Sequence, residues 1–562
     1  MKALSWAVVT ILAFAAASPG EYRIDSTRYF PQPAVEAQSR AAFVAACDAF
    51  VKSSTPATPP AMLHWLQTYD ALLRGLERHD IYVYLRAEED DRDTADAKAD
   101  DALGQLEGRI GDRVVRAARQ LGEARIAAWT QTGPLKPYRF LLEDSLARGT
   151  HRLSVADAHA VDVAVTPVLD AAATSYKAFR KSSDSLASRQ DAYAALLVSI
   201  AAARNGVARL RGFPGAADAA YFDRAISPGS VERTLSAIRA SSAYARYLRV
   251  AALMPKPAVT PSPVTIAQAI PTILAAEQPM GAAYAGAYAA LLDPRNGRLE
   301  ICTAPECDDS GFSLGFAGVQ SAVFYGGFTG SVNAVRAVAH ESGHAVHREF
   351  MSENQPIAAY NRGPSFMFES FAIFNELLFL NHLYESTAND TQRAFYLNYF
   401  LQDATFQVYG SAEETDLERA IYHGVDDGTI RTAADFNTLT TSVFARYDPS
   451  ASQDPKTPLY WAGDRLFFTD PLYDVNYLYA GLLALQYFTG FQRDSTTFSK
   501  RYVALLKNGF NDTQAALEKR FLGIDLSHEA DLVANAGALI DARTTMLSTL
   551  YATASRDGSA PK

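Results

Sequence analysis

Apolar residues recur at spacings of three and four along most of the chain, and this period is typical of amphipathic α-helices. Residues 102–121 and 191–210 show the pattern most clearly. Proline and glycine interrupt it at 53–60, 133–134 and 212–215, where we expect helices to end. Residues 34 to about 250 are therefore predicted to form long amphipathic helices.

A second group of interruptions divides the middle of the chain. Proline density peaks at 255–271, which is typical of a linker or a lobe boundary. Residues 298–302 and 321–325 carry the β-branched and aromatic residues of strands, and glycines flank them, Gly311 and Gly315 included. After them the helical pattern returns and persists almost to the C-terminus. We predict a mainly α protein with one small β-sheet.

Composition and charge narrow the class of protein. The 562 residues are 48% hydrophobic and 20% charged, an ordinary globular balance that excludes a disordered chain. The net charge is −10 and no segment is persistently basic, which argues against a nucleic-acid partner. Three cysteines cannot make a disulfide scaffold. Cys302 and Cys307 could close a small hairpin loop and leave Cys47 over, or all three could be reduced thiols.

The first residues predict an export signal. Lys2 precedes an apolar run at 7–17, which is too short to span a bilayer of ~30 Å. Small residues before Ala17 predict a signal peptide at 1–17, with cleavage after Gly20 as the alternative and a buried N-terminal helix as another interpretation. We therefore expect a periplasmic or secreted protein. No later run of ~18 apolar residues predicts a membrane anchor.

The strongest chemical signal is a pair of histidines on one predicted helix. Ser331 is a suitable N-cap for a helix that begins at Val332. About two and a half turns later the chain reads His340-Glu341-Ser342-Gly343-His344. Residues four apart share a helix face, so the two imidazoles converge on one point. This is the HExxH pattern of zinc peptidases, and it predicts one Zn²⁺ per chain.

A catalytic zinc needs a third protein ligand and one position left open. A second helix is predicted to start near Ser365, and Glu369 lies about one turn into it among phenylalanines, where a carboxylate is costly unless it is paired or binds metal. We predict Glu369 as the third ligand. Glu376, seven residues further on nearly the same face, is predicted to accept a hydrogen bond from a ligand imidazole. His347 is interpreted as structural or as a support for the ligands.

Glu341 lies between the two histidines on the metal side. We predict that it is the general base, which takes a proton from a zinc-activated water and later delivers it to the leaving amine. Gly343 leaves room for a backbone or a substrate to approach this face closely.

These residues resemble the thimet oligopeptidase and oligoendopeptidase F family of zinc metallopeptidases. The family has its third ligand, a glutamate, 25 residues after the second histidine, and that count gives Glu369. Weaker similarity extends over most of the mature chain. The stretches that carry the resemblance are Phe-Thr-Gly at 328–330, HESGHAVH at 340–347 and GPSFMFESFAIFNELL at 363–378.

The resemblance implies a fold and an activity. The fold would be two helical lobes that flank a deep substrate channel, with the small sheet beside the zinc helix; we assign the N-terminal lobe to 18–210 and the catalytic lobe to 211–562. The segment 321–327 would be the strand next to the zinc, with an open edge that pairs with substrate backbone. The activity would be that of a zinc metalloendopeptidase on short oligopeptides, and we expect a monomer.

One feature departs from the family, which carries a histidine followed by tyrosines in a late helix. In the matching stretch at 467–481, Tyr473 and Tyr477 share a face and are candidate oxyanion donors, but two phenylalanines and Thr469 stand near the place of the histidine. The tyrosines could also simply pack in the core. Two other functions stay open: a zinc carboxypeptidase or dipeptidase of a related helical type, and a weakly active zinc-containing peptide-binding protein.

Overall fold

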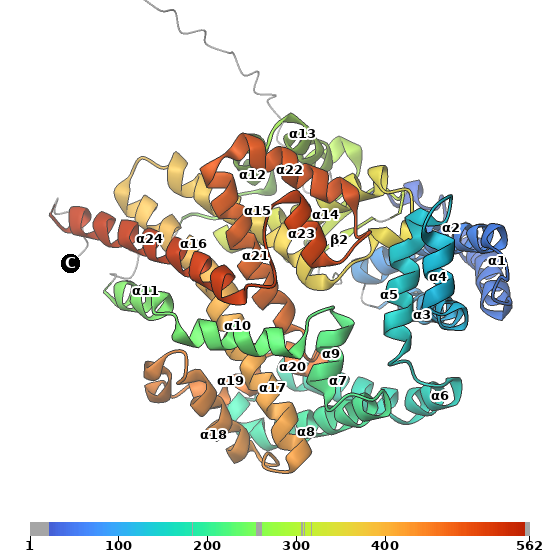
Figure 1. The fold of residues 1–562 in the computed structure, drawn as a ribbon. Coiled ribbons are helices and arrows are strands. Elements are labelled where there is room, and N and C mark those ends of the chain that lie inside the picture. The colour runs from blue at the N-terminus through green and yellow to red at the C-terminus, as the bar shows by residue number, and fades with distance from the viewer. Residues whose placement is uncertain are drawn as a thin grey trace, which may run out of the picture.

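A computed structural model describes residues 22–90, 92–182, 184–253, 261–304, 307, 310–315 and 317–556. The predicted signal peptide at 1–17 lies outside these residues. Helices make up most of the described chain and the strands form one small sheet, so the prediction of a mainly α protein is confirmed (Figure 1). No described helix is both long enough and apolar enough to cross a bilayer.

Five helices near the N-terminus pack together on one side of the molecule (Figure 1). Their buried side chains, among them Leu66, Leu103 and Leu142, form one core with Phe324 of the sheet. The breaks predicted at 53–60 and 133–134 fall between helices of this group. The helices are α1 (Pro33–Lys52), α2 (Pro59–Glu89), α3 (Thr94–Leu121), α4 (Glu123–Thr130) and α5 (Arg139–Gly149).

The remaining helices surround a second and larger core. The first set is α6 (Val155–Ala164), α7 (Thr166–Lys181), α8 (Leu186–Leu210), α9 (Ala216–Asp223), α10 (Pro228–Ala240), α11 (Ala243–Ala252), α12 (Ile266–Glu277) and α13 (Ala282–Leu292). The second set is α14 (Val332–Asn354), α15 (Ser365–Ser386), α16 (Asp390–Thr405), α17 (Ser411–Asp427), α18 (Ala433–Phe444), α19 (Tyr460–Gly463), α20 (Leu466–Thr469), α21 (Asp474–Arg493), α22 (Ser495–Asn508), α23 (Gln514–Phe521) and α24 (Glu529–Arg556).

Helices α7 and α8 contribute to the second core, although they precede the predicted lobe boundary at residue 210. Tyr176 of α7 stacks on Phe468 of α20 with ring centroids 4.2 Å apart, and Tyr193 of α8 meets the same ring edge-on. In Figure 1 these helices lie beside α17 and α18, far from α1. The division at 210 stays a prediction.

The proline-rich segment at 255–271 ends earlier than predicted. Residues 254–260 lie outside the described part, but Pro271 lies inside α12. The prediction of a linker is therefore wrong from Ile266 onward. Thr265 caps the helix through the backbone N–H of Gln268, and buried Ile270 and Ile273 hold the helix in the core despite the hydrogen bond that proline removes.

The sheet has three strands in the order β1-β3-β2. The strands are β1 (Leu299–Cys302), β2 (Gly311–Leu314) and β3 (Ala322–Gly326), with β1 parallel and β2 antiparallel to β3. The prediction of an open edge at 321–327 is wrong, because β3 is the central strand. The available edge belongs to β2, which packs against α14 and which the sequence analysis missed, since its first residue, Gly311, was interpreted as a boundary.

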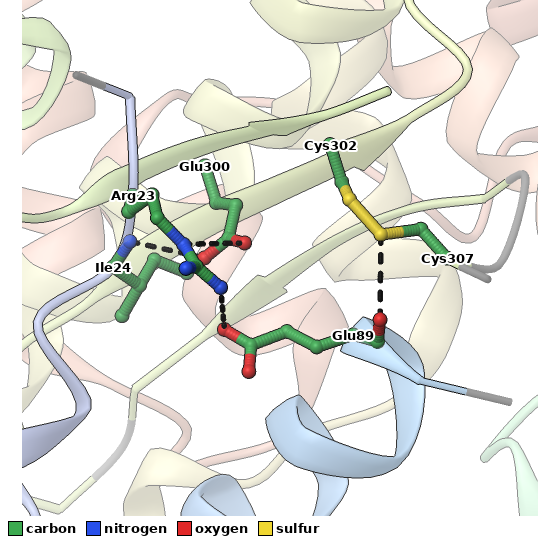
Figure 2. Close-up of a disulfide and its surroundings, with 6 residues drawn as sticks. All are labelled: Arg23, Ile24, Glu89, Glu300, Cys302 and Cys307. Atoms are coloured by element: carbon green, nitrogen blue, oxygen red, sulfur yellow. Dashed lines mark hydrogen bonds and ion pairs between the residues drawn. A yellow bond between two sulfur atoms is a disulfide. The ribbon is translucent and has the colours of Figure 1, made fainter. Parts of the chain in front are cut away.

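A disulfide links Cys302 at the end of β1 to Cys307 (Figure 2). Cys47 is a buried free thiol. This resolves the alternatives in favour of the bridge, but the loop it closes is not a hairpin, since β3 lies between β1 and β2. Close to it, Glu300 accepts a hydrogen bond from the backbone N–H of Ile24 at 3.0 Å. Arg23 approaches both Glu300 and Glu89 at 3.7 Å. The beginning of the described chain is thus held against the sheet.

Candidate metal centre

The site is built on two neighbouring helices, α14 and α15. The Ser331 side chain caps α14, accepting from the backbone N–H of Ala334 at 3.2 Å, as predicted. Gly343 allows the two helices to come close: a Cβ atom there would lie 2.6 Å from Asn375 Nδ2 and 3.1 Å from Ala372 Cα. The room at Gly343 is therefore filled by the backbone of α15 and not by substrate.

This close approach brings His340, His344 and Glu369 together. Glu369 Oε2 lies 3.4 Å from His340 Nε2 and 3.5 Å from His344 Nε2. The two imidazole rings are nearly perpendicular, with centroids 4.8 Å apart. The two nitrogens and the carboxylate oxygen point to one place, as the sequence analysis expected, and their role as metal ligands stays a prediction.

The far side of His340 is supported by charged side chains. Glu376, which is 2% exposed, accepts a hydrogen bond from Nδ1 of His340, as predicted. Arg336, one turn before His340 on α14, bonds both to Glu376 and, at 2.9 Å, to Asp403 of α16. With its Nδ1–H donated to Glu376, His340 keeps the lone pair of Nε2 directed at the site.

Burial and charge together shift the pKa values of these groups. Burial raises the pKa of Glu369, but the neighbouring imidazoles of His340 and His344 more than offset this effect, so the pKa lies below its ordinary range. Burial lowers the pKa of His340, and Glu369 and Glu341 more than offset that effect, so the result is a raised pKa. The carboxylate is thus held ionised, which is the form that binds a metal.

The residues present fit a divalent metal. Glu369 Oε2 is buried and has no hydrogen-bond partner in the described part of the chain, although both imidazole nitrogens face it. A buried oxygen in this state is costly unless a cation binds it. Two imidazole nitrogens and one carboxylate oxygen form the donor set that zinc takes in hydrolytic sites.

Glu341 lies at the boundary between this centre and the sheet. A Cβ atom on Gly311, the first residue of β2, would lie 3.3 Å from Glu341 Cγ and 2.8 Å from the ring of Tyr325. Glycine at this position therefore lets the edge strand run directly beside Glu341. The predicted general base and the free sheet edge are neighbours.

Tyr473, the N-cap residue of α21, and Tyr477, one turn into the helix, approach the centre differently. The Tyr473 hydroxyl donates to Glu369 Oε1 at 3.0 Å. The ring of Tyr477 lies 5.4 Å from that of Tyr473, and its side chain lines a cavity that also contacts His340. Burial raises the pKa of both hydroxyls, and Glu369 raises them further, so both keep their protons.

The stretch that lacks the family histidine turns toward the core. Phe467 and Phe468 are buried, and Phe468 packs on Tyr176 of α7. His347 also points away from the centre. Its ring packs against Phe371, Phe368 and Phe510, and burial holds its pKa well below the usual range, which supports the interpretation that it is structural.

A cavity of about 850 Å³ adjoins the centre. His340 and Glu376 line one part of it, and residues of α17, α19 and α21 line another. The sequence analysis did not single out Arg336, although its spacing of four from His340 places it on the same helix face and could have suggested it.

Two imidazoles four residues apart on one helix, with a carboxylate from the next helix beside them, are the arrangement of the HExxH class of peptidases. Within this class, residues 317–536 match the model of peptidase family M3. This part of the chain, which carries the whole centre, belongs to that family, and the resemblance to the oligoendopeptidase F group is confirmed.

Curated relatives and solved structures agree with this assignment. Chromosomal oligoendopeptidase F of Lactococcus lactis subsp. cremoris is 24% identical over 209 residues, which cover 37% of this chain and 32% of that protein. The match thus spans about a third of the relative's length. Oligoendopeptidase F of Enterococcus faecium shares the fold over 94% of this chain and 100% of that one, with a TM-score of 0.62 and 16% identity. A PZ peptidase A bound to an inhibitor shares it over 90% and 97%, with a TM-score of 0.68 and 14% identity.

Proposed function

We propose that the protein is a zinc-dependent metalloendopeptidase that hydrolyses peptide bonds in short oligopeptides. The observation that carries this proposal is the convergence of His340 Nε2 and His344 Nε2 on one oxygen of Glu369, at 3.4 and 3.5 Å. Membership of the centre in peptidase family M3 supports it. The proposed ligands are these three residues, with one Zn²⁺ per chain.

Zinc bound to such a donor set polarises a carbonyl and makes water a better nucleophile near neutral pH. The chain's own residues supply the remaining steps. Glu341 takes the proton from the attacking water and passes it to the leaving nitrogen. Arg336 and Glu376 hold His340 in the orientation that keeps Nε2 available.

The charge that develops on the carbonyl oxygen needs a hydrogen-bond donor. We assign this role to Tyr477, whose hydroxyl keeps its proton and whose side chain lines the cavity beside His340. Tyr473 holds Glu369 through its hydroxyl in the free protein and is the second candidate donor. The two phenylalanines at 467 and 468 pack in the core and do not replace the family histidine. We therefore expect a lower rate of peptide hydrolysis than in an enzyme that has both the histidine and the tyrosine as donors.

Substrate backbone is proposed to add to the free edge of β2. Gly311 permits a close approach to Glu341, and an extended peptide at this edge would pass the general base. Strand addition of this kind requires a substrate backbone that is not already hydrogen-bonded, which supports short, unfolded peptides as substrates.

Two measurements test the proposal. Metal analysis of the purified protein is expected to find one zinc per chain. Peptides with a fluorophore and quencher flanking internal bonds are expected to be cleaved, and a chelator should abolish cleavage until zinc is restored. Cleavage confined to the C-terminal residues would point to a carboxypeptidase, and absence of chelator-sensitive cleavage would overturn the proposal in favour of a binding protein.

We further propose that the protein is exported, to the periplasm or the medium, after removal of residues 1–17, and that it acts as a monomer. The Cys302–Cys307 bridge supports export, because disulfides persist in oxidising compartments. Mass spectrometry of the mature N-terminus and a thiol count test this. One reactive thiol after denaturation, from Cys47, is the expected result.

A further inference from the structure

A second group of acidic side chains lies in the cavity beside the metal centre. Glu414 comes from α17, Asp464 follows α19 and Asp474 begins α21. Their carboxylate oxygens lie within 4.8 Å of one another, and all three residues line the cavity that His340 and Glu376 line at another point. We call them the carboxylate cluster.

No positively charged side chain of the described residues contacts the carboxylate cluster. No lysine, arginine or histidine nitrogen of the described residues lies within ion-pair distance, 4.0 Å, of any of the three. Arg336, Lys456 and Arg465 line the same cavity, but Arg336 pairs with Glu376 and Asp403, and the other two are exposed. Burial raises the pKa of Asp464 and of Asp474, and the charges of Arg465 and Arg224, which make no ion pair with them, offset this only in part.

The hydrogen bonds of the cluster leave part of it unsatisfied. Glu414 accepts from the Tyr460 hydroxyl, and Asp464 accepts from the backbone N–H of Leu466 at 2.9 Å. Asp474 is 1% exposed, and its Oδ2 has no partner among the described residues. Gln407, 7% exposed in the π-helical turn Phe406–Gly410, also lines the cavity with its Oε1 unpartnered. A buried carboxylate without a partner is costly, so this end of the cavity is built for a positively charged group.

The residues that line the cavity indicate which kind of cation it would bind. Apart from its charged groups, the cavity is lined largely by apolar and aromatic side chains, from Leu186, Leu459, Leu466, Phe406 and Tyr460. The aliphatic stem of a lysine or arginine packs on such a surface while its charged head reaches acidic groups. An ammonium has three N–H donors, which matches three carboxylates that each offer an oxygen.

We propose that Glu414, Asp464 and Asp474 form a subsite for the ammonium or guanidinium of a basic side chain in the oligopeptide substrate. The proposal rests on the proposed peptidase function, because the cavity joins the cluster to the metal centre. A peptide that bridges the two would place a lysine or arginine in the cluster and a backbone carbonyl at the centre. The subsite would select peptides by one basic residue at a fixed distance from the scissile bond.

The test moves a single lysine through every position of a neutral, internally quenched peptide, with norleucine at the same position as the uncharged match. For the wild-type protein we expect one position at which lysine raises kcat/KM about tenfold or more over norleucine, the effect of a hydrogen bond to a charged group. Asp464→Asn and Glu414→Gln should each remove most of this preference and leave norleucine peptides little changed. Asp464 is half-buried, so its variant remains informative if Glu414→Gln fails to fold.

Glu413→Gln is the matched control. Glu413 neighbours Glu414 on α17 and carries the same charge, but it does not line the cavity, so its variant should keep the preference for lysine. Equal rates for lysine and norleucine at every position, or a preference that survives both cluster variants, would overturn the proposal. So would a second metal per chain that Asp464→Asn abolishes, because the cluster would then be a metal site.

A peptide-binding measurement tests the subsite independently of the proposed peptidase activity. The zinc-loaded Glu341→Gln protein should bind the preferred lysine peptide about tenfold more tightly than its norleucine match in calorimetry, and the added Asp464→Asn change should equalise the two. If no peptide is cleaved by the wild type, the peptidase proposal fails while binding still decides the subsite. If norleucine peptides are cleaved in a chelator-sensitive way without a lysine preference, the subsite alone fails.

Discussion

At the metal centre, the charged groups lie beside groups of opposite charge. Glu376 lies between His340 and Arg336, and Arg336 also reaches Asp403. In the carboxylate cluster, at another point of the same cavity, three acids meet with no cation in ion-pair distance among the described residues. The first group thus pairs its own acidic and basic side chains. The second group has no such partner, and in the proposed subsite a basic side chain of the substrate would supply it.

The largest expected effect comes from the general base. Glu341→Gln should lower kcat by about 10²–10⁴-fold while zinc content stays at one per chain, because the ligands remain and only proton transfer is lost. Steady-state kinetics with metal analysis on the same sample measures both. Glu353→Gln, exposed near the end of the same helix, is the control and should be close to wild type. A Glu341→Gln protein with more than a tenth of wild-type kcat would contradict this role.

Substitution of Tyr473 and of Tyr477 should have different effects on kcat and on zinc binding. Tyr477→Phe should lower kcat by about 10²–10³-fold with little change in KM, because it removes a donor to the developing oxyanion. Tyr473→Phe removes the hydroxyl that holds Glu369, so it should also weaken zinc binding. Zinc competition with a coloured chelator, together with kinetics, distinguishes the two. Identical losses of kcat with unchanged zinc affinity in both variants would show that Tyr473 does not act through Glu369.

A smaller effect is expected from the support behind His340. Glu376→Gln should weaken zinc binding about 10–100-fold, because the imidazole loses the carboxylate that orients it and Arg336 loses a partner. Zinc titration at equilibrium measures the change. Glu385→Gln, exposed near the end of the same helix, should leave zinc affinity unchanged.

The smallest effect concerns the pH dependence of stability at the carboxylate cluster. Burial, with the nearby charge of Asp464, raises the pKa of Glu414 to about 8. Between its unfolded pKa, near 4.5, and about pH 8, the unfolded state binds fewer protons than the folded state, so this group's contribution to stability falls as pH rises. Glu414→Gln should therefore make the decrease of Tm from pH 5 to pH 8 shallower. Thermal melts between pH 5 and pH 8 measure this change of Tm. The same slope in the wild type and the variant would contradict the raised pKa of Glu414.

The metal centre was largely predictable from the sequence because its geometry is local. The four-residue spacing of His340 and His344 fixes one face of α14, and the seven-residue spacing of Glu369 and Glu376 does the same on α15. Gly343 was noticed, but its role was not predictable, since only the packed structure shows that α15 fills the space in front of it.

The carboxylate cluster was not predictable in this way. Its three acids come from separate elements, and no helical period relates Glu414 to Asp464 and Asp474. They meet because α17 and α21 pack together, which is a long-range contact that local spacing does not encode. The same limit applies to β2: its four residues begin with glycine, and only pairing with β3 makes them a strand.

The start of the described chain covers the β1 edge of the sheet. The backbone N–H of Ile301 in β1 donates to Tyr22 at 3.3 Å, and that of Asp25 donates to the Gly297 carbonyl at 3.0 Å. One flank of the sheet is thus closed by the protein's own N-terminal segment. If substrate adds to the sheet as proposed, it docks at the opposite flank, beside Glu341. A polypeptide whose backbone is already paired in its own sheet has no row of free amides to offer there. Under this proposal, selection against folded proteins would follow from backbone pairing and not from the side chains that a peptide carries.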